Sequence, residues 1–187
     1  AGFLLCVPIY HHRKFMQSGT IVLRIMQAAD FGAILAIQAQ SYPANLIESR
    51  DALASRHALS PDTCWVAEHG GEVKGYVFAH PWHGDTPPQL NQPLARLPPQ
   101  HDTLFIHDMA LCRSTRGRGI APRLLARLQD KARERGLRFA RLVAVQGAQH
   151  YWARHGYRPY PLPAAKLACY GDDATGMVAE LAASGTS

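Results

Sequence analysis

A short segment rich in glycine and arginine, residues 116–121, has the composition of an anion-binding turn. Its residues are Arg116, Gly117, Arg118, Gly119, Ile120 and Ala121. Glycine lets the backbone approach a bulky anion and turn its N–H groups toward it. The first amides of a helix lack intrahelical partners, and the helix dipole is positive at that end. The segment therefore predicts a cradle for a phosphate or pyrophosphate, to which the arginines add charge-assisted contacts.

Three phosphate-binding patterns compete for this segment. The P-loop pattern fails because no Gly-Lys-Ser/Thr follows, and the dinucleotide pattern G-x-G-x-x-G fails because Pro122 takes the place of its third glycine. The pattern R-x-x-G-x-A, from Arg116 to Ala121, remains. The structural alternative is a glycine-rich turn before an ordinary helix, so the flanking elements decide between the two.

The residues on either side of this segment predict a strand, a turn and a helix. Residues 102–112 (DTLFIHDMALC) are the strongest strand in the chain. After the turn, Ile120, Leu124 and Leu128 recur at helical spacing, and Gly136 ends that helix. A second strand over residues 138–145 and a short helix over residues 148–155 follow.

The rest of the chain supplies further strands and helices. The expected elements are a strand at 20–26, a helix capped by Asp30, a helix at 48–59, a hairpin of 63–68 and 72–79 around Gly70-Gly71, a proline-rich loop at 81–101, and strand-like pieces at 166–170 and 175–181. This order predicts an α/β or α+β sheet with helices packed on it.

The chain's length and composition fit one globular domain of 20–184, preceded by an irregular arm or cloning remnant at 1–19. We expect no secretory signal and no membrane-spanning helix, because the apolar runs are far shorter than ~20 residues. The four cysteines are widely spaced and lack companion histidines at metal spacing. They favour a reducing cytoplasm and predict neither a disulfide framework nor a metal site.

The net charge of +6 is concentrated around the predicted cradle. From Arg113 to Arg141, nine arginines and one lysine stand against two acids, a local balance of +8 that leaves −2 for the rest of the chain. A nucleic-acid surface would need aromatic side chains among these arginines, and the segment has only Phe139. The charge therefore indicates a local anion site and not a nucleic-acid partner.

Three motifs in order resemble the GNAT superfamily of acetyl-CoA-dependent N-acetyltransferases, over roughly residues 20–181. The segment 116–121 matches the family's pyrophosphate loop, Q/R-x-x-G-x-G/A. The strand ending in Met109-Ala110-Leu111 resembles the central strand, whose backbone pairs with the pantetheine arm. Leu142 to Val145 followed by Ala148-x-x-x-Trp152-x-x-x-Gly156-Tyr157 resembles the family's later motif, a strand and then A-x-x-x-Y-x-x-x-G-F.

The resemblance implies a mixed, mostly antiparallel central sheet, with helices on both faces and splayed central strands. It implies acetyl-CoA as acyl donor, a small-molecule amine as acceptor, and direct attack in a ternary complex; a homodimer stays open. Weaker matches are similar to the arylalkylamine-acetylating branch and its bacterial relatives. They are Tyr42-Pro43, Glu48, Gly75-Tyr76, Ala79 to Trp82 and Ile106 to Asp108.

Amine acetylation needs a general base, a polarised thioester carbonyl and a proton for the leaving thiolate. His107 is the leading base, because it falls where that branch carries a base-assisting histidine; by strand alternation we expect it to share a face with Phe105 and Met109. Asp108 is its rival, since a bulge in the strand would change which side chains reach the substrate. The N–H of Met109 or Ala110 is implied to hold the carbonyl oxygen.

The family's general acid is a tyrosine at the position of Trp152, whose indole lacks useful acidity. Tyr151 is adjacent, but one step along a helix turns it ~100° away. Either Tyr151 substitutes for the missing acid, or water and helix amides serve the thiolate. The loss of the tyrosine also motivates an alternative function, a non-catalytic acyl-CoA sensor or regulatory module.

Overall fold

The computed structural model describes residues 20–84 and 86–181 of the chain. The residues predicted as an N-terminal arm, 1–19, and the last residues of the predicted domain lie outside this part. The strands are β1 (Val22–Ile25), β2 (Cys64–His69), β3 (Glu72–Trp82), β4 (Thr103–Leu111), β5 (Phe139–Ala144), β6 (Arg158–Pro159) and β7 (Thr175–Glu180). The helices are α1 (Phe31–Ser41), α2 (Arg50–Leu59), α3 (Ile120–Glu134), α4 (Gln149–Arg154) and α5 (Ala164–Leu167).

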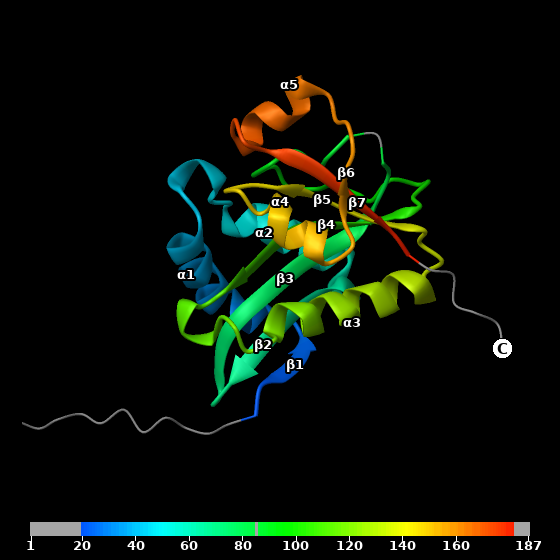
Figure 1. Cartoon of the computed structure of the whole chain (residues 1–187). Helices are drawn as coiled ribbons and strands as arrows, with labels where there is room; N and C mark the ends of the chain where they lie inside the picture. The colour runs from blue at the N-terminus through cyan, green and yellow to red at the C-terminus, as the bar shows by residue number, and fades with distance from the viewer. Residues whose placement is uncertain (1–19, 85, 182–187) are drawn as a thin grey trace, which may run out of the picture.

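The strands form one mixed sheet in the order β1-β2-β3-β4-β5-β7-β6 (Figure 1). Every neighbouring pair is antiparallel except β4 and β5, which run parallel. These two strands pair only where Thr103 to Phe105 meets Phe139 to Arg141 and then separate. The predicted fold class, including the splayed central strands, is confirmed.

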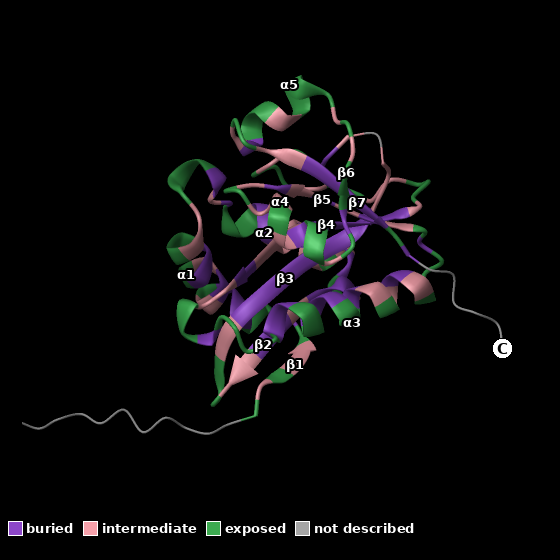
Figure 2. Ribbon diagram, viewed as in Figure 1, coloured by how far each residue is buried: buried purple, intermediate pink, exposed green. Residues whose placement is uncertain are grey.

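Each face of the sheet buries its own apolar cluster under helices, and the purple strands of Figure 2 lie between them. On one face Val77 and Leu104 pack with the α3 stripe, represented by Leu124. On the other face Tyr76 and Phe78 pack with side chains of α1 and α2. Burial on both faces explains the nearly continuous apolar sequences of β3 and β4.

Helix α3 has the predicted stripe and glycines at both ends. Ile120, Leu124 and Leu128 are buried. Gly119 precedes the first helical residue with φ 70°, and Gly136 follows the last turn with φ 68°, conformations that glycine adopts without steric cost. These two residues fix where the helix begins and ends.

Two local predictions need correction. The segment 166–170 was expected to be strand-like but is helical, in α5 and a following 3₁₀ turn of Ala168–Tyr170. Pro163 starts this helix and good helix formers follow it, so local propensity prevails over the apolar pattern. Helix α2 begins at Arg50, after Ser49 caps it by accepting from the Ala52 N–H at 3.2 Å. Glu48 therefore lies before the helix instead of within it.

No helix in the described ranges is long and apolar enough to cross a bilayer.

Candidate active site

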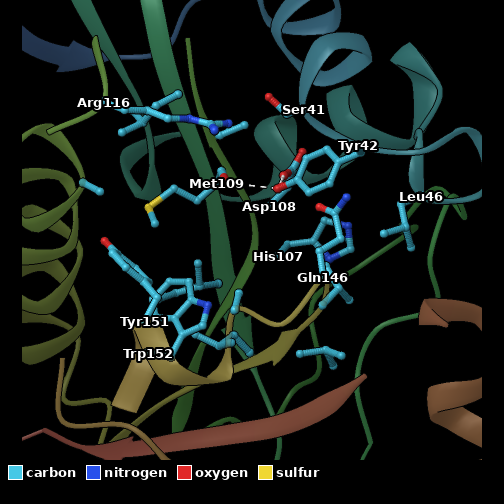
Figure 3. A pocket seen from close by; sticks show the side chains of 18 of the residues that line it. Ser41, Tyr42, Leu46, His107, Asp108, Met109, Arg116, Gln146, Tyr151 and Trp152 are labelled. Carbon is cyan, nitrogen blue, oxygen red and sulfur yellow. Dashed lines mark hydrogen bonds between the residues drawn. The ribbon is translucent and has the colours of Figure 1, made fainter. Parts of the chain in front are cut away.

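A cavity of about 710 Å³ opens where β4 and β5 separate (Figure 3). Its wall contains the turn before α3, the second half of β4, the loop after β5 and helix α4. On the opposite side it reaches residues at the end of α1 and before α2. Segments far apart in the sequence are thus joined around one space.

At one end of the cavity the wall is the predicted anion cradle. Arg116, Gly117, Gly119, Ile120 and Ala121 line it, whereas Arg118 lies outside the wall. A Cβ placed on either glycine would meet no protein atom within 4 Å, so the space in front of this turn is open. An open glycine turn at a helix start fits the diphosphate of a nucleotide-linked thioester.

Along its middle the cavity follows the backbone of β4. Met109, Ala110 and Leu111 line this stretch. Because β5 pairs with β4 only as far as Phe105, the β4 edge facing β5 has no strand partner beyond that point. Such an edge offers main-chain N–H and C=O groups to an extended ligand. It fits the amide-bearing arm that the resemblance implies.

A β-bulge in β4 decides where the candidate bases point. Phe78 pairs with Asp108 while Ala79 pairs with Ile106, so His107 is the extra residue. As a result His107 and Asp108 both contact side chains from the α1–α2 side of the sheet, through the hydrogen bonds described below. Met109 packs instead with the α3-side cluster, so the expectation that it shares a face with His107 is wrong.

His107 is held by a buried carboxylate whose role the sequence did not show. Its Nε2 lies 2.6 Å from Glu48 Oε1, and the two side chains are 0% and 2% exposed. Burial raises the pKa of Glu48, but His107, Arg56 and the Asn91 N–H outweigh burial and leave the pKa below its ordinary value. An ionised carboxylate only accepts, so Nε2 carries the hydrogen. In the neutral ring, Nδ1 then holds the basic lone pair, and it has no partner within the described ranges.

The surroundings of Asp108 shift its pKa in the opposite direction to that of Glu48. The hydroxyls of Tyr42 and Tyr76 donate to its two carboxylate oxygens at 2.7 and 2.8 Å. Burial raises the pKa of Asp108, and these two hydrogen bonds offset only part of that effect. The bulge therefore brings both predicted bases to one region and places each against a different partner, Glu48 for His107 and two tyrosine hydroxyls for Asp108.

A second histidine lies behind His107. The His80 ring is 6.0 Å from the His107 ring, centroid to centroid, and stacks on Phe105 at 6.1 Å. Burial, with a smaller contribution from the nearby His107, lowers the pKa of His80 to about 3. His80 is thus a neutral, buried side chain that packs beside His107 and does not itself line the cavity.

Tyr151 and Trp152 both line the cavity from α4. Trp152 is 7% exposed and packs edge-on against Tyr157. The Tyr151 hydroxyl is buried, has no hydrogen-bond partner among the described residues, and has its pKa raised by burial. One step along the helix, ~100°, separates Tyr151 from Trp152. Tyr151 nevertheless lines the cavity, because the cavity spans more than one face of this short helix.

The proline-rich loop borders the cavity at the end formed by residues next to α1 and α2. Its Asn91 N–H donates to Glu48 Oε2 at 2.7 Å. The guanidinium of Arg56, 0% exposed, donates to the carbonyls of Gln89 and Gln92 and lies 3.6 Å from Glu48. The same carboxylate thus holds both the loop and His107. Sequence reasoning missed Arg56, whose only signal was a charge in a short helix.

Comparisons with known proteins agree with this architecture. The chain matches the model of the acetyltransferase (GNAT) family over residues 31–157. No curated protein matches it. Its fold is similar to the GphF GNAT-like decarboxylase in complex with isobutyryl-CoA, at TM-score 0.73 and 19% identity, with 86% of this chain and 100% of that chain covered.

Two further solved structures share the fold. The loading GNATL domain of CurA from Lyngbya majuscula has a TM-score of 0.74 at 11% identity, covering 87% of this chain and 98% of that chain. Ard1 from Thermoplasma volcanium has a TM-score of 0.65 at 17% identity, with 87% and 98% covered. Because the family model spans more than half of the 187 residues, the chain belongs to the GNAT acetyltransferase family.

Proposed function

We propose that this protein transfers the acetyl group of acetyl-CoA to a primary amine of a small molecule, by direct attack in a ternary complex. One observation carries the proposal. A single cavity joins the open glycine turn of α3, the unpaired edge of β4 and the buried His107–Glu48 pair. Acetyl-CoA bound along the glycine turn and the edge of β4 would present its thioester close to the His107–Glu48 pair.

In this proposal His107 is the general base. Glu48 fixes the ring so that Nδ1 has the free lone pair, as the carboxylate does in other oriented histidine bases. Because the ring is buried at rest, the proton passes when the amine sits against the wall, directly or through one water. Asp108 is the rival base, and its raised pKa would let it hold a proton.

The acetyl transfer forms a C–N bond and breaks the C–S bond of the thioester. The N–H of Met109 or Ala110 stabilises the carbonyl oxygen as negative charge develops on it. Counted from the protonated amine, two protons leave the nitrogen; one ends on the CoA sulfur and the other reaches solvent. We propose Tyr151 as the donor to the thiolate, since this residue lines the cavity and its hydroxyl makes no hydrogen bond to the described residues.

The acceptor end supports an arylalkylamine-like substrate. Leu46, Leu90 and Tyr170 line it with apolar surface. The two acids there are already bound, Glu48 by His107 and Asp108 by Tyr42. This lining suits an amine with an apolar body better than a polyamine, whose distal ammonium would need a free carboxylate.

The decisive experiment measures thiol release from acetyl-CoA with a panel of arylalkylamines, polyamines and peptides, for wild type, His107→Ala and Asp108→Asn. We expect turnover with monoamines and a loss of about 10²-fold or more in His107→Ala, with the acidic limb of the pH–rate profile changed, because a general base must be deprotonated to act. CoA binding without turnover on any amine would support the sensor alternative. Release of CO₂ from malonyl-CoA, without acetylation of any amine, would contradict the proposed acetyl transfer and indicate a decarboxylase.

A further inference from the structure

Gln146, in the loop after β5, combines an unusual backbone with a place in the cavity wall. Its φ is 54°, in the left-handed region that side chains other than glycine, asparagine and aspartate rarely adopt. The same loop fixes this conformation from both sides. Gly147 donates its N–H to Asp173 Oδ2 at 2.9 Å, and the Ala148 N–H donates to the Val145 carbonyl at 3.0 Å.

The side chain of Gln146 extends into the cavity that holds His107 and Tyr42 (Figure 3). Among the described residues, nothing accepts from or donates to its amide by a hydrogen bond. Glu48 and Asp108, the cavity's acids, are occupied by His107 and Tyr42. Gln146 is therefore an exposed, neutral polar side chain that lines the cavity without a hydrogen bond to any described residue.

Strained backbone persists where the surrounding structure imposes it, and at functional sites it sets the direction of a side chain. A glycine at position 146 would remove the strain, and the loop already contains one at position 147. This chain has a glutamine at position 146 in spite of that cost. Its place in the same cavity as His107 points to contact with the group that His107 serves, the acceptor nitrogen.

On the basis of the proposed function, we propose that the Gln146 amide oxygen accepts a hydrogen bond from the acceptor amine and selects primary over N-methylated amines. A primary ammonium gives one proton to His107 and keeps two N–H bonds. One of these donates to Gln146, which leaves the lone pair directed at the thioester carbon. In an N-methylamine a methyl group replaces one of those N–H bonds, so the position opposite Gln146 loses its donor or the nitrogen must turn.

The test compares kcat/KM for a primary amine that the wild type accepts and for its N-methyl derivative. In Gln146→Met the side chain keeps its length and backbone conformation but loses the amide. We expect the ratio of primary to N-methyl activity to fall about fivefold to tenfold, the value of one hydrogen bond, with KM for acetyl-CoA unchanged. Gln146→Gly should lose the ratio as well, while resisting denaturant at least as well as the wild type, because the strain is relieved.

Gln149→Ala is the matched control. Gln149 carries the same amide three residues further on, on α4, and does not line the cavity. Its removal should leave the selectivity ratio at the wild-type value. If Gln146→Met keeps the full ratio, the inference is wrong even though amine acetylation stands. If the wild type acetylates no amine, the proposed function and the inference both fall.

Discussion

At the scale of single residues, two neighbouring carboxylates have pKa shifts of opposite sign. Charges and a backbone N–H lower the pKa of Glu48 in spite of its burial, whereas burial raises the pKa of Asp108. Groups whose environments separate their proton affinities are typical of acid–base sites. Here the ionised member, Glu48, holds His107, so the environment assigns the two acids different tasks.

Replacing Glu48 by Gln should reduce stability by about 3 kcal/mol at neutral pH, because it leaves the buried Arg56 without its counter-charge. The folded-state pKa of Glu48 is lowered, so its contribution is present above the ordinary carboxyl pKa and is lost as the pH falls through the folded-state value. Chemical denaturation across this pH range should show that the difference in unfolding free energy between wild type and variant decreases at acidic pH. Glu134→Gln, at an exposed pair on α3, should cost no more than about 0.5 kcal/mol. A gap that stays constant with pH would refute the ionic role of Glu48.

Replacing Tyr151 by Phe should lower kcat about 10²-fold, because the thiolate loses its proton donor, while KM for acetyl-CoA stays unchanged. Stability should not fall, since the hydroxyl has no hydrogen bond to lose within the described part of the protein. Tyr157→Phe is the control: its hydroxyl is also buried without a partner there, but it does not line the cavity. Equal kinetic effects of the two variants would exclude Tyr151 as the acid and favour water.

At the scale of elements, the two ends of α3 are alike in backbone and differ in surroundings. Gly119 and Gly136 both have left-handed φ angles, and a Cβ on either would meet no protein atom within 4 Å. Only Gly119 lies in the cavity wall. Comparing substitutions at Gly119 and Gly136 therefore separates the cost of backbone strain from an effect on ligand binding.

Changing either glycine to Ala should reduce stability by a similar amount, roughly 1 kcal/mol, because a side chain is disfavoured in the left-handed region. Gly119→Ala should in addition weaken acetyl-CoA binding at least tenfold, since its methyl group would occupy space beside the diphosphate. Gly136→Ala should bind acetyl-CoA normally. Calorimetric titration of both variants measures the difference, and equal affinities would remove the α3 turn from the donor site.

At the scale of the whole molecule, the cavity is shared by layers on both faces of the sheet. The end that we propose for the donor is formed by the start of α3 and by α4. The end that we propose for the acceptor is formed by residues next to α1 and α2 and by the proline-rich loop. A ligand spanning both ends would connect the two apolar clusters through the gap between β4 and β5. Binding should therefore stabilise the fold as a unit.

Acetyl-CoA at a hundredfold excess over its Kd should raise the melting temperature by about 5 to 10 °C, the shift expected from mass action for a domain of this size. Acetyl-pantetheine lacks the diphosphate, so at the same concentration it should produce a much smaller shift. Thermal denaturation followed by fluorescence measures both. Equal shifts would show that the α3 turn contributes nothing to donor binding.

The sequence by itself determined what local chemistry controls. The glycines around α3, the apolar stripe of that helix, the Gly70-Gly71 hairpin and the order of three motifs predict the family and the position of the anion cradle. Each depends on spacing along a few residues, where periodicity and φ preferences act directly. The strand predicted over residues 166–170 was wrong because a short apolar run is compatible with either a strand or a helix.

Only the tertiary structure decided how distant residues meet. The bulge at His107 is a register shift between two strands, and no local pattern marks it. Glu48, just before α2, and Arg56, within α2, reach the site because this part of the chain packs against the sheet on the side of α1, and Gln146 enters it because β4 and β5 diverge. The contacts of Glu48 with His107 and of Arg56 with the proline-rich loop join residues tens of positions apart, so their energies depend on packing and burial, which a single sequence does not display.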